Sequence, residues 1–103
     1  MATKTPKVLS LRGFLAFQIL HELKRKRLCG DELAENIGKK KGSKLTPGTI
    51  YPTLKYLRKK KLLTRKKYGR KKIYDLTEKG VEEYKVFKRA FIKIFKDIYN
   101  KKI

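Results

Sequence analysis

A change of hydrophobic period near residue 62 constrains the fold of this chain more than any other feature. Before it, apolar residues recur at the three- and four-residue steps of helices, whereas residues 62–77 alternate between apolar and polar around Gly69. Alternation around a glycine is typical of a β-hairpin. After Thr77 the helical period returns. We therefore predict a mainly α fold with one small β-hairpin and a long C-terminal helix.

Two helices are predicted in the first forty residues. The first runs from Leu11 to Lys26 and is apolar around most of its circumference, with Ser10 placed to cap it, so we expect it to be central and buried. The second is short, from Asp31 to Ile37, and carries Leu33 on its inner face. Gly38 is predicted to end this second helix.

A third helix is predicted over residues 47–60, with Thr46 as its cap and Pro47 at its first position, where no N–H donor is needed. The segment LTPGTIYPTLKYL places three apolar residues at helical spacing, which are Ile50, Leu54 and Leu57. It also contains Gly48 and Pro52, residues that weaken helices. Something other than helix stability must favour them at this place.

In the hairpin, Gly69 and Arg70 are predicted to form the turn. This turn sets the pairing of the two strands, with Leu63 opposite Leu76, Arg65 opposite Tyr74 and Lys66 opposite Ile73.

Thr77 is predicted to cap a last helix from Glu78 to about Lys101. This helix has an apolar seam, which is expected to pack against another helix. The seam can fold back on the first helix or cover a second subunit, and both can hold in part. We favour a dimer interface, because a small domain has little surface left to cover a helix of roughly 36 Å. The expected interface residues are Leu11, Phe14, Tyr84, Phe87, Phe91, Ile94, Phe95 and Ile98.

The charge indicates a polyanionic partner. The formal net charge is +21, from 30 Lys and Arg against 9 Asp and Glu, and no acidic residue lies between Glu35 and Asp75. Nucleic acid is the first candidate. A single cysteine, Cys29, is expected to pack as a small buried side chain and fits a reducing cytoplasm. The chain has no apolar run long enough to cross a membrane and no signal-like start, so we expect a cytoplasmic protein.

Catalysis, metal binding and cofactors are not expected. His21 and Cys29 are the only residues of their types, so one chain cannot build a zinc site from such ligands. The stretch GKKKGSK, residues 38–44, lacks the spacing of a phosphate-binding loop and no strand precedes it. No nucleophile is paired with a base, so we expect no enzyme.

Three helices followed by a basic hairpin is the order of a winged helix-turn-helix, in which the third helix reads the major groove and the hairpin is the wing. The residues that carry a closer resemblance are LRGFL at 11–15, Gly30 with Glu32 and Leu33, the LTPGTIYPTLKYL segment, and YGRKKIYDLTEKG at 68–80. With these motifs the chain resembles the PadR-type transcriptional regulators over nearly its whole length.

This resemblance implies a homodimeric DNA-binding repressor acting on a pseudo-palindromic operator. Residues 1–77 would form the DNA-binding domain and residues 78–103 the dimerisation helix. Some family members bind small aromatic effectors. The chain ends soon after one C-terminal helix and has no Trp, a residue that helps form the ligand pocket in some relatives, which argues against an effector.

We hypothesise that Gly48 leaves room for DNA, Pro52 contacts a thymine methyl or a sugar, and Thr49 and Tyr51 bind bases or phosphates. The wing would contact phosphates or the minor groove. The full expected DNA-binding set is Thr46, Gly48, Thr49, Tyr51, Pro52, Lys55, Lys59, Arg65, Lys67, Arg70, Lys71 and Lys72.

Other interpretations of the same residues stay open. Tyr51 and Tyr56 can pack the edge of the core, and the wing can be a solvated charged hairpin. For the whole protein, the alternatives are an RNA-binding or ribosome-associated winged domain and an architectural DNA-binding protein with little sequence preference. Competition between structured RNA and duplex DNA would separate the first of these from a DNA-binding regulator.

Overall fold

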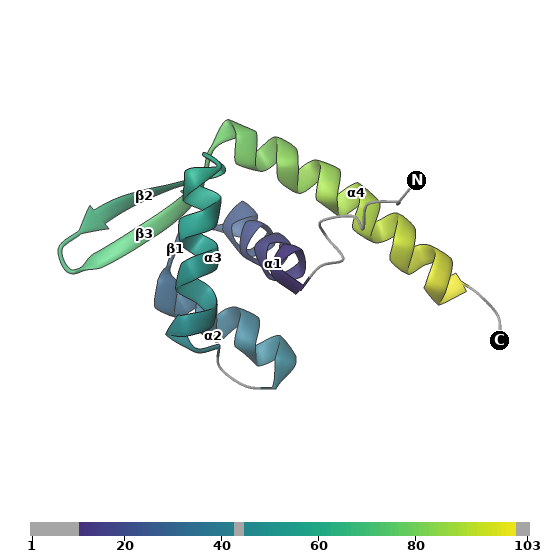
Figure 1. The fold of residues 1–103 in the computed structure, drawn as a ribbon, viewed down its shortest axis with the longest axis horizontal. Coiled ribbons are helices and arrows are strands. Elements are labelled where there is room, and N and C mark those ends of the chain that lie inside the picture. The colour runs from purple at the N-terminus through teal and green to yellow at the C-terminus, as the bar shows by residue number, and fades with distance from the viewer. Residues whose placement is uncertain (1–10, 43–44, 101–103) are drawn as a thin grey trace, which may run out of the picture.

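The computed structural model describes residues 11–42 and 45–100 of the chain, without the side chains of Leu11, Arg12 and Lys41. The predicted cap Ser10 and the predicted helix end Lys101 lie outside these residues. The elements are α1 (Leu11–Arg25), β1 (Leu28–Cys29), α2 (Gly30–Lys41), α3 (Pro47–Lys59), β2 (Leu63–Tyr68), β3 (Lys71–Leu76) and α4 (Glu78–Asn100). They form an elongated body of 52 × 30 × 25 Å (Figure 1).

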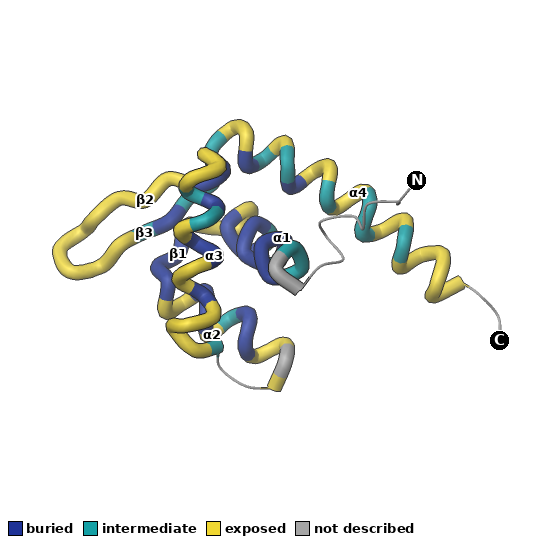
Figure 2. Tube along the Cα trace, viewed as in Figure 1, coloured by how far each residue is buried: buried dark blue, intermediate teal, exposed yellow. Residues whose placement is uncertain are grey.

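Helix α1 is the centre of the molecule, as its apolar circumference predicted. It packs against α2, α3, β3 and α4, and Ile19 and Leu20 are fully buried. Figure 2 shows the middle of this helix as a mostly buried segment beside α3. The inward residues of the neighbouring helices complete the core, namely Leu33, Ile37, Ile50, Leu54 and Leu57.

Helix α2 is longer than the sequence predicted. It does not end at Gly38, which is buried inside the helix, but continues to Lys41. The helix ends instead at Gly42, whose φ of 82° is left-handed and whose N–H donates to the carbonyl oxygen of Lys39. Glycine reaches that conformation without steric cost, so the second glycine of the GKKKG stretch is the stop signal.

The hairpin has the predicted register. Leu63 pairs with Leu76, Arg65 with Tyr74 and Lys66 with Ile73. Gly69 has a φ of 61° at the first position of the two-residue turn, as a type II′ turn requires. The sequence did not reveal β1, which pairs with Tyr74 and Ile73 on the free side of β3 and makes a three-stranded antiparallel sheet in the order β1-β3-β2.

Thr77 joins the wing, the end of α3 and the start of α4. Its hydroxyl accepts a hydrogen bond from the Gly80 N–H at 2.9 Å, so the predicted cap is confirmed, and donates to the carbonyl oxygen of Lys61 at 2.7 Å. Gly80 lies so close to the chain after α3 that a Cβ there would overlap the carbonyl oxygen of Leu62. The start of α4 is thereby fixed against the segment that follows α3.

Candidate nucleic-acid interface

Helix α3 presents one buried face and one exposed face, as predicted. Ile50, Leu54 and Leu57 are at most 1% exposed. The exposed face carries Gly48, Thr49, Pro52, Lys55 and Lys59. Tyr56 is half-buried and packs against the core, which agrees with the packing alternative for this residue.

The N-terminus of α3 is built differently from the prediction. Thr46 occupies the cap position, but its side chain makes no capping hydrogen bond to a backbone N–H. Its carbonyl oxygen accepts the N–H groups of Thr49 and Ile50, at 3.0 and 3.1 Å. Its hydroxyl lies 3.1 Å from the hydroxyl of Thr49, so two exposed hydroxyl groups meet at the tip of the helix. Such a tip favours anions, because N–H groups and the helix dipole point at it.

Neither Gly48 nor Pro52 is needed by the fold. A Cβ at Gly48 would have no heavy atom nearer than the Thr46 hydroxyl oxygen, at 4.0 Å. Pro52 is exposed at the sixth position of α3 and removes a helix donor. Both residues lower the stability of the helix, and on its exposed face no packing within the chain compensates for this cost. We therefore look for the reason for Gly48 and Pro52 in a binding partner.

Tyr51 lies at the edge of this exposed face and is 40% exposed. Its ring is seated on Gly30, where a Cβ would come within 2.6 Å of the phenol oxygen. Its hydroxyl donates to Oδ1 of Asp31 at 3.4 Å. Partial burial, followed by the charge of Asp31, raises the pKa of Tyr51, so the phenol stays protonated at neutral pH. The sequence analysis had not singled out Asp31.

The wing is a strongly basic hairpin, and almost none of it is covered by the rest of the chain. From Thr64 to Lys72 every residue is exposed. Lys67 lies directly opposite Lys72, a like-charge pair that destabilises a hairpin. Tyr68, beside the turn, is 54% exposed and had not been singled out either. A hairpin with these charges is best explained by a polyanion that approaches it.

Helix α3 and the wing share one hollow. Its volume is about 360 Å³, and it lies between the start of α2, α3 and the turn end of β3. Tyr51 lines it from α3, and Arg70, Lys71 and Lys72 line it from the wing. Residues that are about 20 positions apart in sequence are thus brought to one basic surface. The other predicted wing residues, Arg65 and Lys67, lie on β2 and are exposed.

The basic residues of this surface form no ion pair with the described part of the chain, although the carboxylate of Asp31 lines the same hollow. Two ion pairs occur within residues 11–42 and 45–100, between Lys40 and Glu22 and between Lys85 and Glu82. Neither involves α3 or the wing. The surface is therefore available to phosphate groups.

The predicted dimer residues fall into two groups along α4. In the first half, Tyr84 is buried at 4% exposure, and Phe87 and Phe91 pack against the core of the same chain. Rings from both helices meet here, with Phe17 4.9 Å and Phe14 5.8 Å from Phe91 between centroids. For these residues the alternative of folding back on α1 describes the structure. The side chain of Leu11 lies outside the described residues.

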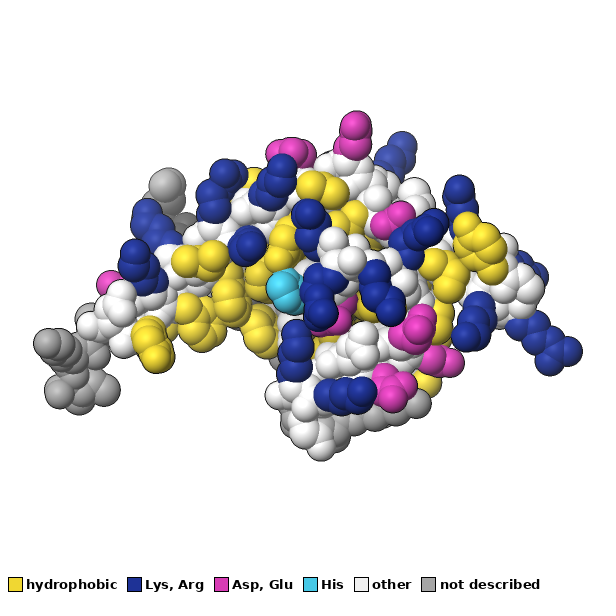
Figure 3. Space-filling model, turned by 180° about the vertical axis from the view of Figure 1, so that it is seen from behind, with side chains coloured by type: hydrophobic (Ala, Val, Ile, Leu, Met, Phe, Trp, Pro, Cys, Tyr) yellow, Lys and Arg dark blue, Asp and Glu magenta, His cyan; other side chains and the backbone are white. Residues whose placement is uncertain are grey.

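The second half of α4 extends beyond the other elements (Figure 1). It keeps apolar side chains exposed. Ile94 is half-buried, whereas Phe95 and Ile98 are 50% and 63% exposed. We call the exposed apolar residues of this second half the tail face, which comprises Ile92, Phe95, Ile98 and Tyr99. Seen from behind in Figure 3, hydrophobic side chains form a band along α4 that reaches the histidine.

His21 ties α1 to α4. Its Nδ1 lies 2.7 Å from the hydroxyl of Tyr84, and the two rings are 5.8 Å apart between centroids. Burial, followed by the nearby charge of Lys40, lowers the pKa of His21. Burial raises the pKa of Tyr84. The pair is therefore neutral at neutral pH and joins the two helices through a hydrogen bond.

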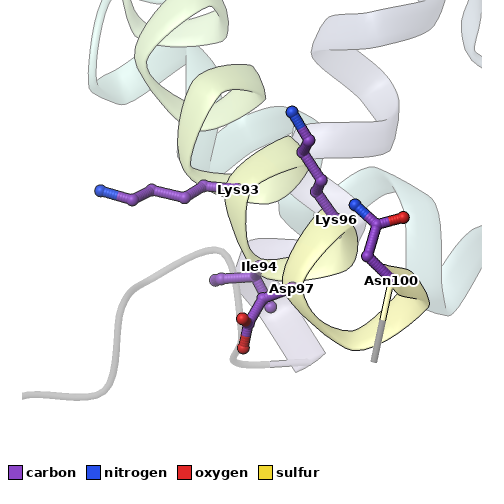
Figure 4. Close-up of a pocket in the computed structure, with 5 residues that line it drawn as sticks. All are labelled: Lys93, Ile94, Lys96, Asp97 and Asn100. Carbon is purple, nitrogen blue, oxygen red and sulfur yellow. The ribbon is translucent and has the colours of Figure 1, made fainter. Parts of the chain in front are cut away.

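A hollow of about 630 Å³ lies at the end of α4, and the described residues that line it all belong to that one helix: Lys93, Ile94, Lys96, Asp97 and Asn100. Figure 4 shows that these side chains fan out around the helix instead of converging. This is an open helix surface and not a ligand site.

Among the described residues there is also no group of three or more His, Cys, Asp or Glu side chains that could hold a metal. No helix in residues 11–42 and 45–100 is long and apolar enough to cross a membrane.

A three-helix core with a basic wing and an exposed α3 defines a winged helix-turn-helix protein of the DNA-binding class. The sequence profile of the PadR-like family of transcriptional regulators matches residues 19–86. The chain therefore belongs to the PadR-like family and is a DNA-binding transcriptional regulator, as its motifs indicated. No similar sequence was found among curated proteins.

Solved structures of regulators share this fold. A PadR-like transcriptional regulator from Bacillus cereus ATCC 14579 has a TM-score of 0.78 and 28% identity, over 87% of this chain and 92% of that one. A transcriptional regulator from Clostridium thermocellum has a TM-score of 0.74 and 23% identity, over 90% and 96% of the two chains. A PadR family regulator from Clostridium difficile R20291 has a TM-score of 0.71 and 24% identity, over 85% and 96%.

Proposed function

We propose that this protein is a cytoplasmic, homodimeric repressor that binds an inverted-repeat operator and occludes a promoter. Residues 1–77 form its DNA-binding domain and residues 78–103 its dimerisation helix. The mechanism needs neither a cofactor nor a catalytic step. The observation that carries the proposal is the shared hollow, where Tyr51 of α3 meets three basic residues of the wing. A helix and a hairpin that converge in this way can hold a duplex by its major groove and an adjacent backbone.

The proposed contacts divide by chemistry. Lys55 and Lys59 on α3 and the basic residues of the wing bind phosphates and set affinity. Gly48 and Pro52 allow the helix to approach the base edges closely, and Thr49 and Tyr51 supply polar groups there. The hydroxyl of Thr46 at the helix tip binds a backbone phosphate.

The tail face supports the homodimer. Four large apolar side chains on one side of the helix, each at least 50% exposed, mark a surface that a partner covers. In the dimer this face packs on its copy and on α1 of the partner chain. Two α3 helices then meet successive major grooves about 34 Å apart, which requires a two-fold symmetric site.

Selection of bound sequences from a random duplex pool at physiological salt tests the proposal. We expect a consensus with two-fold symmetry and a particle mass of two chains in light scattering. A pool without enrichment, together with equal affinity for any duplex, would favour the architectural alternative. Stronger binding of structured RNA than of the selected duplex would favour the RNA-binding alternative.

A further inference from the structure

We infer that Asp31 is a positioning residue for base readout: its carboxylate draws the Tyr51 hydroxyl proton toward the start of α2, so that the phenol meets a base only as a hydrogen-bond acceptor. The inference deepens the proposed function and rests on it. It also names a specificity residue on α2, outside the helix that enters the groove.

The first argument is the position of the Tyr51 ring against Gly30. A Cβ on Gly30 would lie 2.6 to 2.8 Å from three atoms of the phenol, so only glycine allows the ring to take this place. The ring therefore lies against the start of α2, and its hydroxyl is brought beside Asp31. The phenol lines the hollow that it shares with the basic residues of the wing.

The second argument is the direction of the proton. Oδ1 of Asp31 lies 3.4 Å from the phenol oxygen. This separation is long for an O–H···O bond, so the hydrogen bond is weak and the carboxylate orients the O–H dipole mainly through its charge. An ionised carboxylate only accepts, and therefore the proton points toward Asp31 and the lone pairs of the phenol oxygen point elsewhere.

The consequence for DNA follows from base chemistry. In the major groove adenine and cytosine present exocyclic amino groups, which donate, whereas guanine and thymine present keto oxygens, which accept. A phenol that can only accept selects an amino base over a keto base on the strand that it contacts. It also binds phosphate oxygens poorly, since these are acceptors as well.

The third argument is the charge of Asp31 itself. It is an exposed carboxylate beside a surface that otherwise carries Lys and Arg, so it lowers the affinity for every duplex. A residue that lowers general affinity while it fixes a base contact raises the difference between right and wrong sequences.

The experiment uses the full chain and the operator obtained by selection. Affinities are measured for Asp31→Ala, Asp31→Asn, Tyr51→Phe and the double variant Asp31→Ala with Tyr51→Phe, against the operator and against versions with each base pair of a half-site replaced. Glu35→Ala is the matched control, because it removes the same charge one turn along α2. Tyr68→Phe removes an exposed hydroxyl with no hydrogen bond to the described residues.

We expect wild type to prefer an amino base at one position of each half-site by roughly fivefold or more. Tyr51→Phe and both Asp31 variants should remove this preference, and Asp31→Ala should change it no further in the Tyr51→Phe background. Glu35→Ala and Tyr68→Phe should keep it. Asp31 variants should also bind unrelated duplexes more tightly than wild type does.

The inference is overturned if both Asp31 variants retain the wild-type preference at every position, or if they lose affinity equally at all positions. Neither result touches the proposed function, because the operator would still be selected. Failure of that function is different, since wild type itself would then enrich no sequence.

Discussion

Gly48 shows how one position can weaken the fold and still be useful. Glycine inside a helix costs about 0.5–1 kcal/mol relative to alanine. The structure offers open space for the missing methyl group, so nothing within the chain repays this cost. We attribute it to the close approach of DNA in the proposed complex.

Replacement of Gly48 by alanine should therefore have opposite effects on stability and binding. We expect the free energy of unfolding to rise by about 0.5–1 kcal/mol, measured by urea denaturation. The affinity for the selected operator should fall in the same variant. Unchanged affinity would contradict the close approach.

Gly80→Ala is the matched control on a second helix. Its methyl group would overlap the carbonyl oxygen of Leu62, a backbone atom that cannot move away cheaply. We expect a loss of about 2 kcal/mol or more in stability, in the direction opposite to Gly48→Ala.

At the scale of elements, the wing carries a repulsion that its own strands do not need. Lys67 and Lys72 face each other across the ladder. Lys67→Glu converts this pair into an attraction worth roughly 0.2–1 kcal/mol. We expect a more stable hairpin, seen as slower amide exchange in β2 and β3, and a weaker complex with any duplex.

Salt dependence provides the readout of that weaker complex. Losing one phosphate contact should reduce the slope of log affinity against log salt by about one. Glu83→Lys, at a half-buried position of α4, is a control with the opposite charge change. A variant Lys67→Glu that binds DNA as wild type does would remove β2 from the interface.

The contact between α1 and α4 predicts a pH dependence of stability. The folded chain lowers the pKa of His21 from its ordinary value of 6.5, so it binds that proton more weakly than the unfolded chain does. This contribution to stability is complete above about pH 6.5 and is lost as the pH falls through the lowered pKa. Urea denaturation between about pH 7.5 and pH 5 should show falling stability, with a flatter profile in His21→Gln.

A carboxylate, that of Glu32, gives a second effect on stability in a separate pH range. Hydrogen bonds from Cys29, the backbone N–H first, lower the pKa of Glu32 from 4.5. The stability that this interaction adds is present above about pH 4.5 and is lost in more acidic solution. The two ranges therefore identify which group titrates.

How far the sequence predicts each element depends on how local its signals are. The register of the wing could be predicted because Gly69 and the alternation around it fix the pairing. β1 could not, since its two residues have no period of their own and depend on Tyr74 and Ile73, more than 40 positions away. The end of α2 was misplaced because Gly38 and Gly42 look alike in sequence, and only the burial of the first distinguishes them.

The same distinction holds for the candidate site. The outward face of α3 follows from its helical period, so its exposed residues could be named in advance. Asp31 could not be named, because its relation to Tyr51 depends on how α2 packs against α3. The first half of α4 was likewise assigned to a partner, although Tyr84 is buried by α1 of the same chain.

At the scale of the whole molecule, the tail face allows dimerisation to be tested separately from folding. Phe95 is 50% exposed in one chain, so Phe95→Asp should leave the protomer folded while it places a charge in the proposed interface. We expect light scattering to report single chains and circular dichroism to report an unchanged helix content. Operator affinity should fall steeply, because two half-sites are no longer bound together.

Lys96→Asp is the control for this experiment, as it puts the same side chain on an exposed polar position of α4. It should remain a dimer. If Phe95→Asp also keeps the mass of two chains, the tail face is not the dimer contact.

The single hydroxyl of Thr77 has a consequence for the DNA that the protein can accept. Because it is bonded to the carbonyl of Lys61 on one side and to the N–H of Gly80 on the other, it holds the end of α3 against the start of α4. In the proposed dimer this connection keeps the two α3 helices at a fixed spacing. One inserted base pair between half-sites turns the second one by about 34–36° around the duplex axis, so we expect the proposed dimer to select the length of its operator as strictly as the sequence.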